Sequence, residues 1–199
     1  SDGSGPRATL VNVNGTFFGT TYGGGANCSS SGGCGTVFAI SPSGAESVVH
    51  SFGAGSDGVH PAAGLVDVNG TLYGTTVYGG ANGDGTVFAI PRFGPLTVLY
   101  SFAGGSDGAS PRAGLLNVNG TLYGTTSAGG ASCGTNFGCG TVFSITTSGT
   151  ETVLHGFGGT SAADGANPYA GLVRLNGKLY GTTLFGGANN AGTVFSLTP

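Results

Sequence analysis

The stretch Asn69-Gly70-Thr71-Leu72-Tyr73-Gly74-Thr75-Thr76 decides the fold, because the chain contains it four times with few changes. Its counterparts occupy residues 14–21, 119–126 and 176–183. Each copy is followed by Gly-Thr-Val-Phe and preceded by an Asp-Gly-x-x-Pro motif, which starts at Asp2, Asp57, Asp107 and Asp164. Blocks that return about every 50 residues indicate a tandem array. The four repeats cover approximately residues 1–52, 53–102, 103–157 and 158–199.

Each repeat is predicted to form four short antiparallel strands. In the second repeat, residues 65–68 lead into Asn69-Gly70, a turn pair that favours a tight hairpin because both positions accept positive φ. Residues 71–76 form the return strand, and residues 85–90 and 97–102 form the third and fourth strands. No segment carries a sustained helical period. The sequence therefore predicts an all-β protein whose 44 glycines lie at turns.

This repeat length and strand number are typical of a kelch-type β-propeller blade. The third strand of the first repeat, Val37-Phe38-Ala39-Ile40, is apolar on both faces, which suits a sheet packed between two neighbouring sheets. We therefore expect one domain over residues 1–199, a small β-propeller of four kelch-like blades with four antiparallel strands each.

The last repeat is shorter than the others. It ends at Pro199, just after Phe195-Ser196-Leu197, and lacks a fourth, outer strand. Residues 1–8 are expected to contain no strand that could replace it. The last blade should therefore have an open edge, and an exposed edge can be protected within a monomer or recruit another chain.

The composition excludes several classes of protein. Five Lys and Arg residues against eight Asp and Glu give a net charge of −3, too few cations for a nucleic-acid partner. No apolar run approaches the length of a transmembrane segment. A hydrophobic content of 38% with only 8 prolines excludes disordered and collagen-like chains. The opening Ser1-Asp2-Gly3 is not an apolar signal stretch, so we expect a processed, mature chain.

The blocks Val-Asn-Gly-Thr-Leu-Tyr-Gly-Thr-Thr, Gly-Gly-Ala, Gly-Thr-Val-Phe and Ser-Phe-x-Gly-Gly-x-Asp-Gly closely resemble the GloVer tandem repeat over essentially the whole chain. That repeat is found in secreted bacterial proteins described as choice-of-anchor GloVer-containing proteins. The resemblance implies export, and often surface attachment, and it brings no catalytic residues. The strand pattern also looks like kelch, in which a Gly-Gly pair follows the second strand as Gly79-Gly80 does here.

Four cysteines lie in two loops that are five residues longer in repeats 1 and 3 than in the other repeats. Cys28 and Cys34 share the first loop, and Cys133 and Cys139 share the second. Pairing within each loop is favoured because only those cysteines are sure to come within disulfide reach. A four-cysteine zinc site is the alternative, and it lacks the usual short spacing between ligands.

The repeated aspartates Asp2, Asp57, Asp107 and Asp164 are expected on one face around the propeller axis. Four converging carboxylates with loop carbonyls could hold a hard cation such as Ca²⁺. The favoured interpretation is that each aspartate caps its own turn, as Asp before Gly commonly does.

Residues beside the proline differ between repeats: Gly5/Arg7, His60/Ala62, Ser110/Arg112 and Asn167/Tyr169. We interpret such variable positions as free of demands from the fold, and so as candidates for ligand specificity. The predicted ligand-binding set, which adds nearby aromatic rings that could stack on sugars, is Arg7, Tyr22, His60, Tyr78, Arg112, Tyr169 and Phe185.

Three functions remain open, in this order. The first is a secreted, non-enzymatic propeller that binds carbohydrate or another surface ligand through repeated clefts. The second is a structural subunit of an extracellular assembly that self-associates through the open edge of the last blade. The third is a polysaccharide-acting enzyme with His60 as general base beside Tyr169 or Arg112. His50, Tyr100 and His155 share one position in the fourth strands, which indicates a packing role.

Overall fold

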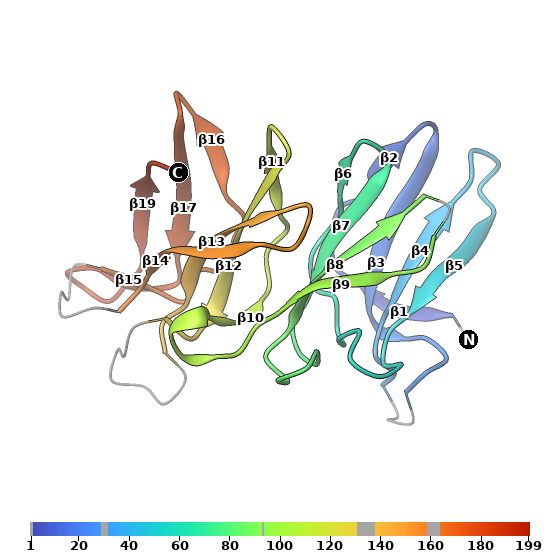
Figure 1. Cartoon of the computed structure of the whole chain (residues 1–199), viewed down its shortest axis with the longest axis horizontal. Helices are drawn as coiled ribbons and strands as arrows, with labels where there is room; N and C mark the ends of the chain where they lie inside the picture. Colours follow the sequence, from blue (N-terminus) through green and yellow to red (C-terminus); the bar gives the residue numbers. More distant parts are fainter. Residues whose placement is uncertain (1, 29–31, 93, 131–137, 159–163) are drawn as a thin grey trace. The chain divides into compact units, whose positions relative to one another are not determined.

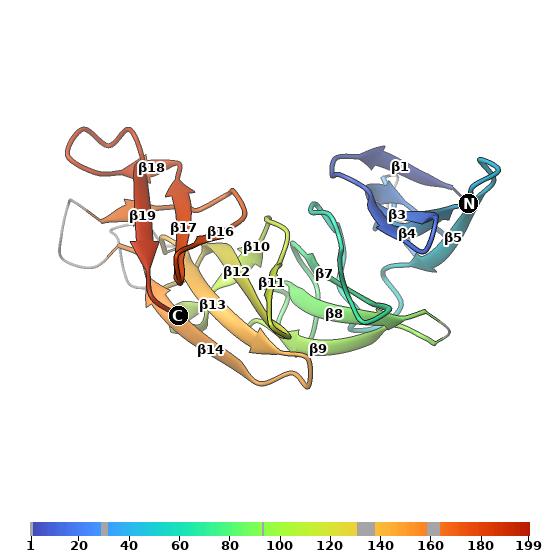
Figure 2. The same ribbon diagram turned by 90° about the horizontal axis from the view of Figure 1, so that it is seen from above.

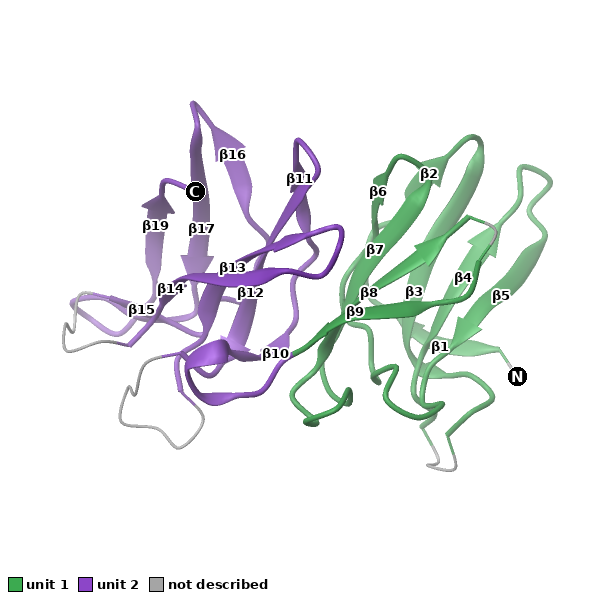
Figure 3. Cartoon of the chain, viewed as in Figure 1, with its two compact units in different colours: residues 1–101 green, residues 102–199 purple. Residues whose placement is uncertain are grey.

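The computed structural model of the chain is all-β and describes residues 2–28, 32–92, 94–130, 138–158 and 164–199 (Figure 1). The chain divides into two compact units, Ser1–Ser101 (unit 1) and Phe102–Pro199 (unit 2), and each holds two repeats (Figure 3). None of the described segments forms a helix long and apolar enough to cross a membrane.

Unit 1 contains one antiparallel sheet from each of its repeats. The first sheet has the strand order β1-β3-β4-β5, with β2 beside the other half of β3, and the second has the order β6-β7-β8-β9. The strands of unit 1 are β1 (Gly3–Pro6), β2 (Val11–Val13), β3 (Thr16–Gly24), β4 (Thr36–Ile40), β5 (Glu46–Ser51), β6 (Val66–Val68), β7 (Thr71–Thr76), β8 (Thr86–Pro91) and β9 (Thr97–Ser101).

Unit 2 repeats this arrangement and loses its outer strand at the end. The third repeat has the order β10-β12-β13-β14 with β11 beside β12, and the fourth has β16-β17-β19 with a separate β15-β18 pair. A 3₁₀ turn at Gly105–Asp107 precedes the strands β10 (Ala109–Pro111), β11 (Leu116–Val118), β12 (Thr121–Ala128), β13 (Thr141–Thr146), β14 (Glu151–Gly156), β15 (Gly165–Ala166), β16 (Val173–Leu175), β17 (Lys178–Thr183), β18 (Phe185–Gly186) and β19 (Thr193–Leu197).

The predicted all-β class and the four-strand order are confirmed. So is the missing outer strand, because β19 pairs only with β17 in the described part of unit 2 (Figure 2). Residues 1–8 do contain a strand, β1, but it pairs with Thr21–Gly24 of β3 in the first repeat and not with the last repeat. The residues that follow the repeated aspartate are therefore extended in the first repeat. The same segment forms β10, which pairs with β12, in repeat 3 and β15, which pairs with β18, in repeat 4. No described sheet closes on itself, so a ring of four blades stays a prediction.

A close approach explains the glycine of the Gly-Thr-Thr block. A Cβ at Gly74 would lie 2.5 Å from Phe88 Cζ and 2.8 Å from Leu65 Cδ2, so only glycine lets both side chains cross the strand. The hairpin prediction is also confirmed, since Asn69 has φ of 53° at the turn. The counterparts of Gly74 are equally crowded at Gly19, Gly124 and Gly181.

A buried hydroxyl pair explains the threonines. Thr76 Oγ1 donates to Tyr78 O at 3.0 Å and lies 2.8 Å from Thr86 Oγ1. Because Thr76 has only one hydroxyl proton, Thr86 Oγ1 is the donor between the two hydroxyls, and Thr86 N donates to the same oxygen at 3.2 Å. The same pair occurs as Thr21/Thr36, Thr126/Thr141 and Thr183/Thr193.

The hydrophobic core lies between consecutive sheets. We call the side of a sheet that packs on the following repeat its front face and the opposite side its rear face. In unit 1 the front face of repeat 1 supplies Val13, Val37 and Phe52, and the rear face of repeat 2 supplies Leu65, Leu72, Phe88 and Ile90. In unit 2 Val142 and Phe157 pack in the same way on Leu172 and Leu179. We call such a contact a joint.

The hydroxyl pair gives a stability prediction. Thr76→Val keeps the shape of a fully buried side chain but removes the acceptor of Thr86 N and one of the two donors to Tyr78 O, which keeps its bond from Val59 N. We expect the free energy of unfolding to fall by about 1–3 kcal/mol. Thr76→Ser, which retains the oxygen, should lose clearly less in the same denaturant titration. Equal losses would show that the hydroxyl is not what stabilises this strand pair.

Candidate ligand-binding site

The residue before the repeated proline has a left-handed backbone in all four repeats. φ is 65° at Gly5, 60° at His60, 56° at Ser110 and 53° at Asn167. Residues before proline normally avoid helical backbone conformations, and non-glycine residues rarely adopt positive φ. The interpretation of this position as free of demands from the fold was therefore wrong, because the fold imposes a strained conformation on every residue there.

His60 is held in that conformation by three hydrogen bonds. Its backbone N–H donates to Cys34 O at 2.7 Å, and its carbonyl accepts from Val77 N at 3.2 Å. Nδ1 lies 2.8 Å from Tyr22 O, and because a carbonyl only accepts, Nδ1 carries the proton. Cys34 and Tyr22 belong to repeat 1, so His60 fastens repeat 2 to repeat 1.

Asn167 does the same in unit 2. Its backbone N–H donates to Cys139 O at 2.7 Å, and its side-chain Nδ2 donates to Ser127 O at 2.6 Å. Its carbonyl accepts from Leu184 N at 3.1 Å. An imidazole and a carboxamide thus occupy one structural role, which requires a short side chain that donates a hydrogen bond and tolerates positive φ.

In unit 1 four of the predicted ligand-binding residues come together across the joint. The Arg7 guanidinium lies 4.0 Å from the centre of the Tyr22 ring, which stacks on His60 at 4.6 Å with an interplanar angle of 13°. The His60 ring meets Tyr78 edge to face at 6.2 Å. Arg7 and Tyr78 are exposed at the two ends, and the central rings are half-buried. We call this row, Arg7-Tyr22-His60-Tyr78, the aromatic ladder.

In unit 2 the positions equivalent to the aromatic ladder are Arg112, Ser127, Asn167 and Phe185, and the arginine instead contacts Tyr169, two residues after Asn167. Arg112 lies 5.3 Å from the Tyr169 ring centre and donates from Nε to Ser127 Oγ at 3.3 Å. Ser127 replaces the tyrosine of the aromatic ladder, and its hydroxyl donates to Ser110 O at 2.8 Å. Tyr169 and Phe185 present exposed rings. Arg112, Tyr169 and Phe185 form what we call the second cluster.

The two sites reveal a period of two repeats that the sequence reasoning missed. Repeats 1 and 3 carry the arginine after the proline and the long cysteine loop, whereas repeats 2 and 4 carry an exposed ring at Tyr78 and Phe185. The recurrence of Arg7 as Arg112 was the available signal. The predicted binding residues therefore group by pairs of repeats.

The repeated aspartates each bond to their own loop. Asp57 Oδ1 accepts from Gly53 N at 3.0 Å, and Oδ2 lies 2.8 Å from His50 Nε2. The equivalent bonds join Ala103 N to Asp107 Oδ2 and Gly158 N to Asp164 Oδ2, whereas Asp2 Oδ1 accepts from the N–H of the next residue, Gly3. This is the capping arrangement that the sequence favoured. Within the described residues no three His, Cys, Asp or Glu side chains are grouped to hold a metal ion.

One carboxyl group close to these loops titrates unusually. Burial, with a smaller effect from the nearby Asp107 carboxylate, raises the pKa of Glu151 to about 7. Its counterpart in repeat 1 is Glu46, which lines a pocket with Asp2. A glutamate near the repeated aspartate, Glu46 with Asp2 and Glu151 with Asp107, thus occurs in repeats 1 and 3, the same repeats that carry the arginines.

The first predicted disulfide is confirmed. Cys28 and Cys34 are bonded, with 5.6 Å between their Cα atoms. Cys34 is also the residue whose carbonyl holds His60, so this crosslink lies directly beneath the aromatic ladder. Cys133 lies outside the described residues, so its pairing with the buried Cys139 stays a prediction.

Fold and site together define a protein built from tandem antiparallel β-sheet repeats with aromatic and arginine clusters at its joints. The chain belongs to the Gloeobacter/Verrucomicrobia repeat family, with a match over residues 28–199. This confirms the GloVer resemblance. No curated protein matches the chain. Among solved structures it is similar to a candidate 6-phosphogluconolactonase from Bacteroides uniformis, with 16% identity and a TM-score of 0.45 over 92% of this chain and 54% of that one. The chain thus spans about half the length of that protein.

The role of His60 can be tested by two substitutions. His60→Asn supplies the residue that repeat 4 uses, so the free energy of unfolding should change by less than about 1 kcal/mol. His60→Val places a β-branched residue at positive φ and removes the donor to Tyr22 O, so we expect a loss of about 2–3 kcal/mol. Denaturant unfolding measures both. Equal losses would contradict the fastening role.

Proposed function

We propose that this protein is an exported, non-enzymatic binding protein that holds a carbohydrate on the aromatic ladder of unit 1 and on the second cluster of unit 2. The observation that carries the proposal is the row of touching rings, with Arg7 over Tyr22, Tyr22 stacked on His60 and Tyr78 exposed at the end. Flat apolar ring faces beside fixed hydrogen-bond donors suit a ligand with apolar and hydroxylated surfaces.

The rigidity of the aromatic ladder supports a binding role. His60 is fixed by bonds to Cys34 O and Tyr22 O, and the disulfide closes the loop beneath it. A surface that is already ordered loses little conformational entropy when a ligand binds. Strained backbone at His60 is consistent with this, since such strain clusters where a structure holds a ligand.

Export is supported by two findings. The chain belongs to the Gloeobacter/Verrucomicrobia repeat family, and its resemblance to the GloVer repeat of secreted proteins implies export. It also contains the Cys28–Cys34 disulfide. Disulfides persist mainly in oxidising compartments outside the cytosol. We therefore infer an extracellular or cell-surface location.

We further propose that the repeats are blades of a kelch-like β-propeller. Support comes from the antiparallel order β6-β7-β8-β9 and from the face-to-face packing of consecutive sheets inside each unit. Four strands per blade and blades that bury one another are the features of this architecture.

The two other functions are weaker candidates. An enzyme centred on His60 would have to use Nε2 as its base, because Nδ1 donates to Tyr22 O, and the ring is held in place by its stacking on Tyr22. A calcium site at the aspartates would have to compete with the loop bonds that Asp57 and Asp164 already accept. A structural subunit is favoured by one specific observation, the unpaired outer side of β19 in the described chain.

Binding can be tested with an array of neutral and acidic oligosaccharides, followed by calorimetric titration of the best binder. Tyr78→Ala removes the exposed ring of the aromatic ladder and should weaken binding by about tenfold, equivalent to about 1.4 kcal/mol. Val49→Ala, an exposed position on β5 outside the ladder, is the matched control and should bind as the unaltered protein does.

Two results would contradict the proposal. One is an array with no sugar above background for the unaltered protein. The other is binding that survives Tyr78→Ala and Phe185→Ala combined, which would place the ligand away from both clusters. Release of reducing ends from a bound polysaccharide would favour the enzyme instead.

A further inference from the structure

The front face of the last repeat is apolar and open. Val173, Leu175 and Val194 lie on it together, because Val173 pairs with Tyr180, Leu175 with Lys178 and Thr182 with Val194. Val194 is 79% exposed, whereas its counterparts Val37 and Val142 are fully buried in the two joints. Val173 and Leu175 are exposed as well.

The rear face of the first repeat is open in the complementary way. Leu10 is 46% exposed, whereas Leu65 and Leu172 occupy that position in the joints at 8% and 5%. Phe17 is 40% exposed, whereas Leu72 is 3% exposed. Large exposed apolar groups that gather on one surface mark an interaction site.

We propose that these two faces dock on one another between two copies of this chain, head to tail. The joints in units 1 and 2 show what covers each face. A front-face valine is covered by rear-face leucine and phenylalanine side chains, as Val37 is by Leu65, Leu72 and Phe88. The rear face of repeat 1 offers the same chemistry with the exposed Leu10 and Phe17. The new contact therefore extends an interface that the chain already builds twice.

Charge distinguishes this contact from the joints inside the units. The rear face of repeat 1 carries Glu46 where repeat 2 has Leu96, which packs on a cluster that contains Val13. Val13 pairs with Thr16, and the counterpart of Thr16 in the last repeat is Lys178. Glu46 and Lys178 thus lie on the two opposing faces with opposite charges, which favours the head-to-tail arrangement over a contact between like faces.

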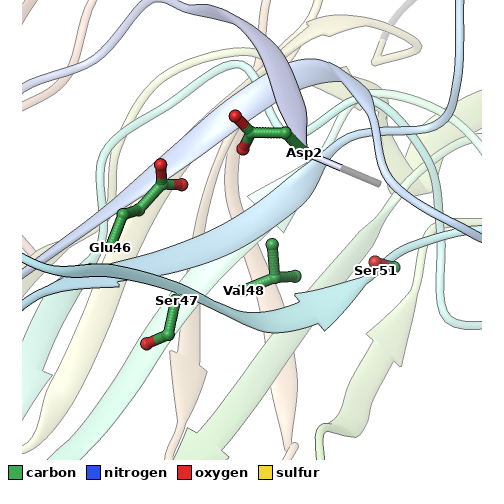
Figure 4. Close-up of a pocket in the computed structure, with 5 residues that line it drawn as sticks. All are labelled: Asp2, Glu46, Ser47, Val48 and Ser51. Carbon is green, nitrogen blue, oxygen red and sulfur yellow. The ribbon is translucent and has the colours of Figure 1, made fainter.

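A pocket on the rear face of repeat 1 fits this inference (Figure 4). It has a volume of about 360 Å³ and is lined by Asp2, Glu46, Ser47, Val48 and Ser51. Val48 pairs with Phe38, so the pocket opens on the same face as Phe38. Docking of a second copy would cover it.

The contact should be weaker than the joints. Phe52 and Phe157 follow the outer strands of repeats 1 and 3 and are buried in the two joints, and the last repeat has no such residue. We therefore expect association that reverses on dilution. Matching faces at opposite ends of one chain give a heterologous contact, which closes into a ring if the rotation allows.

This inference does not rest on sugar binding. The residues of the contact are absent from the aromatic ladder and from the second cluster, so a failure of either proposal leaves the other standing.

The test uses charged variants of each face and sedimentation velocity over a range of protein concentrations. Val194→Lys alters the front face at an exposed position, and Leu10→Lys alters the rear face, with Phe17→Lys as a second rear-face variant if Leu10→Lys unfolds. Ser56→Lys adds the same charge in an exposed loop and is the control. Circular dichroism checks that each variant keeps its sheet content.

We expect a reversible dimer for the unaltered protein and for Ser56→Lys, and dissociation constants at least about tenfold higher for either face variant alone. Mixing Val194→Lys with Leu10→Lys should restore a dimer, because one of its contacts then joins two unaltered faces. A monomer at every concentration, as closure within one chain would give, overturns the proposal. So does a dimer that Leu10→Lys and Phe17→Lys leave intact, which would indicate pairing through β19 or between two front faces.

Discussion

The structure depends on one constraint, which is that each sheet is apolar on both faces and cannot bury either face by itself. Val87 and Phe88 are neighbours on β8, so their side chains point to opposite sides, and both are fully buried. Phe88 is covered by the preceding repeat. A repeat of this kind is stable only between neighbours, as in other repeat proteins. The small number of charged side chains follows from the same constraint.

The candidate site exists because of the joint. His60 belongs to repeat 2, but its backbone and side chain bond to Cys34 and Tyr22 of repeat 1. The aromatic ladder therefore forms only when two repeats dock, and the disulfide in the first repeat holds the loop that provides the acceptor. Stability and the proposed binding surface are thus linked through the same few residues.

Local features were predictable from the sequence. The Asn-Gly hairpins, the strand order and the Cys28–Cys34 pair all follow from rules about neighbouring residues. The left-handed backbone at His60 was not predictable, because residues before proline normally avoid it. The grouping of Arg7, Tyr22 and Tyr78 was equally hidden, since it depends on how one repeat sits on the next. Their function as a group remains a proposal.

The central claim is that an uncovered face of a repeat becomes buried when a second copy of the chain docks on it, as the faces in the joints are buried by the neighbouring repeat. Hydrogen exchange at the amides of β17 and β19 tests this claim most directly. These amides should exchange faster than those of β12 and β13 at low protein concentration. Their exchange should slow as the concentration rises, because a second copy covers Val194. Two results would contradict the account. One is that the β17 and β19 amides exchange as slowly as those of β13 even in dilute protein. The other is that they exchange fast and at the same rate at low and high protein concentration.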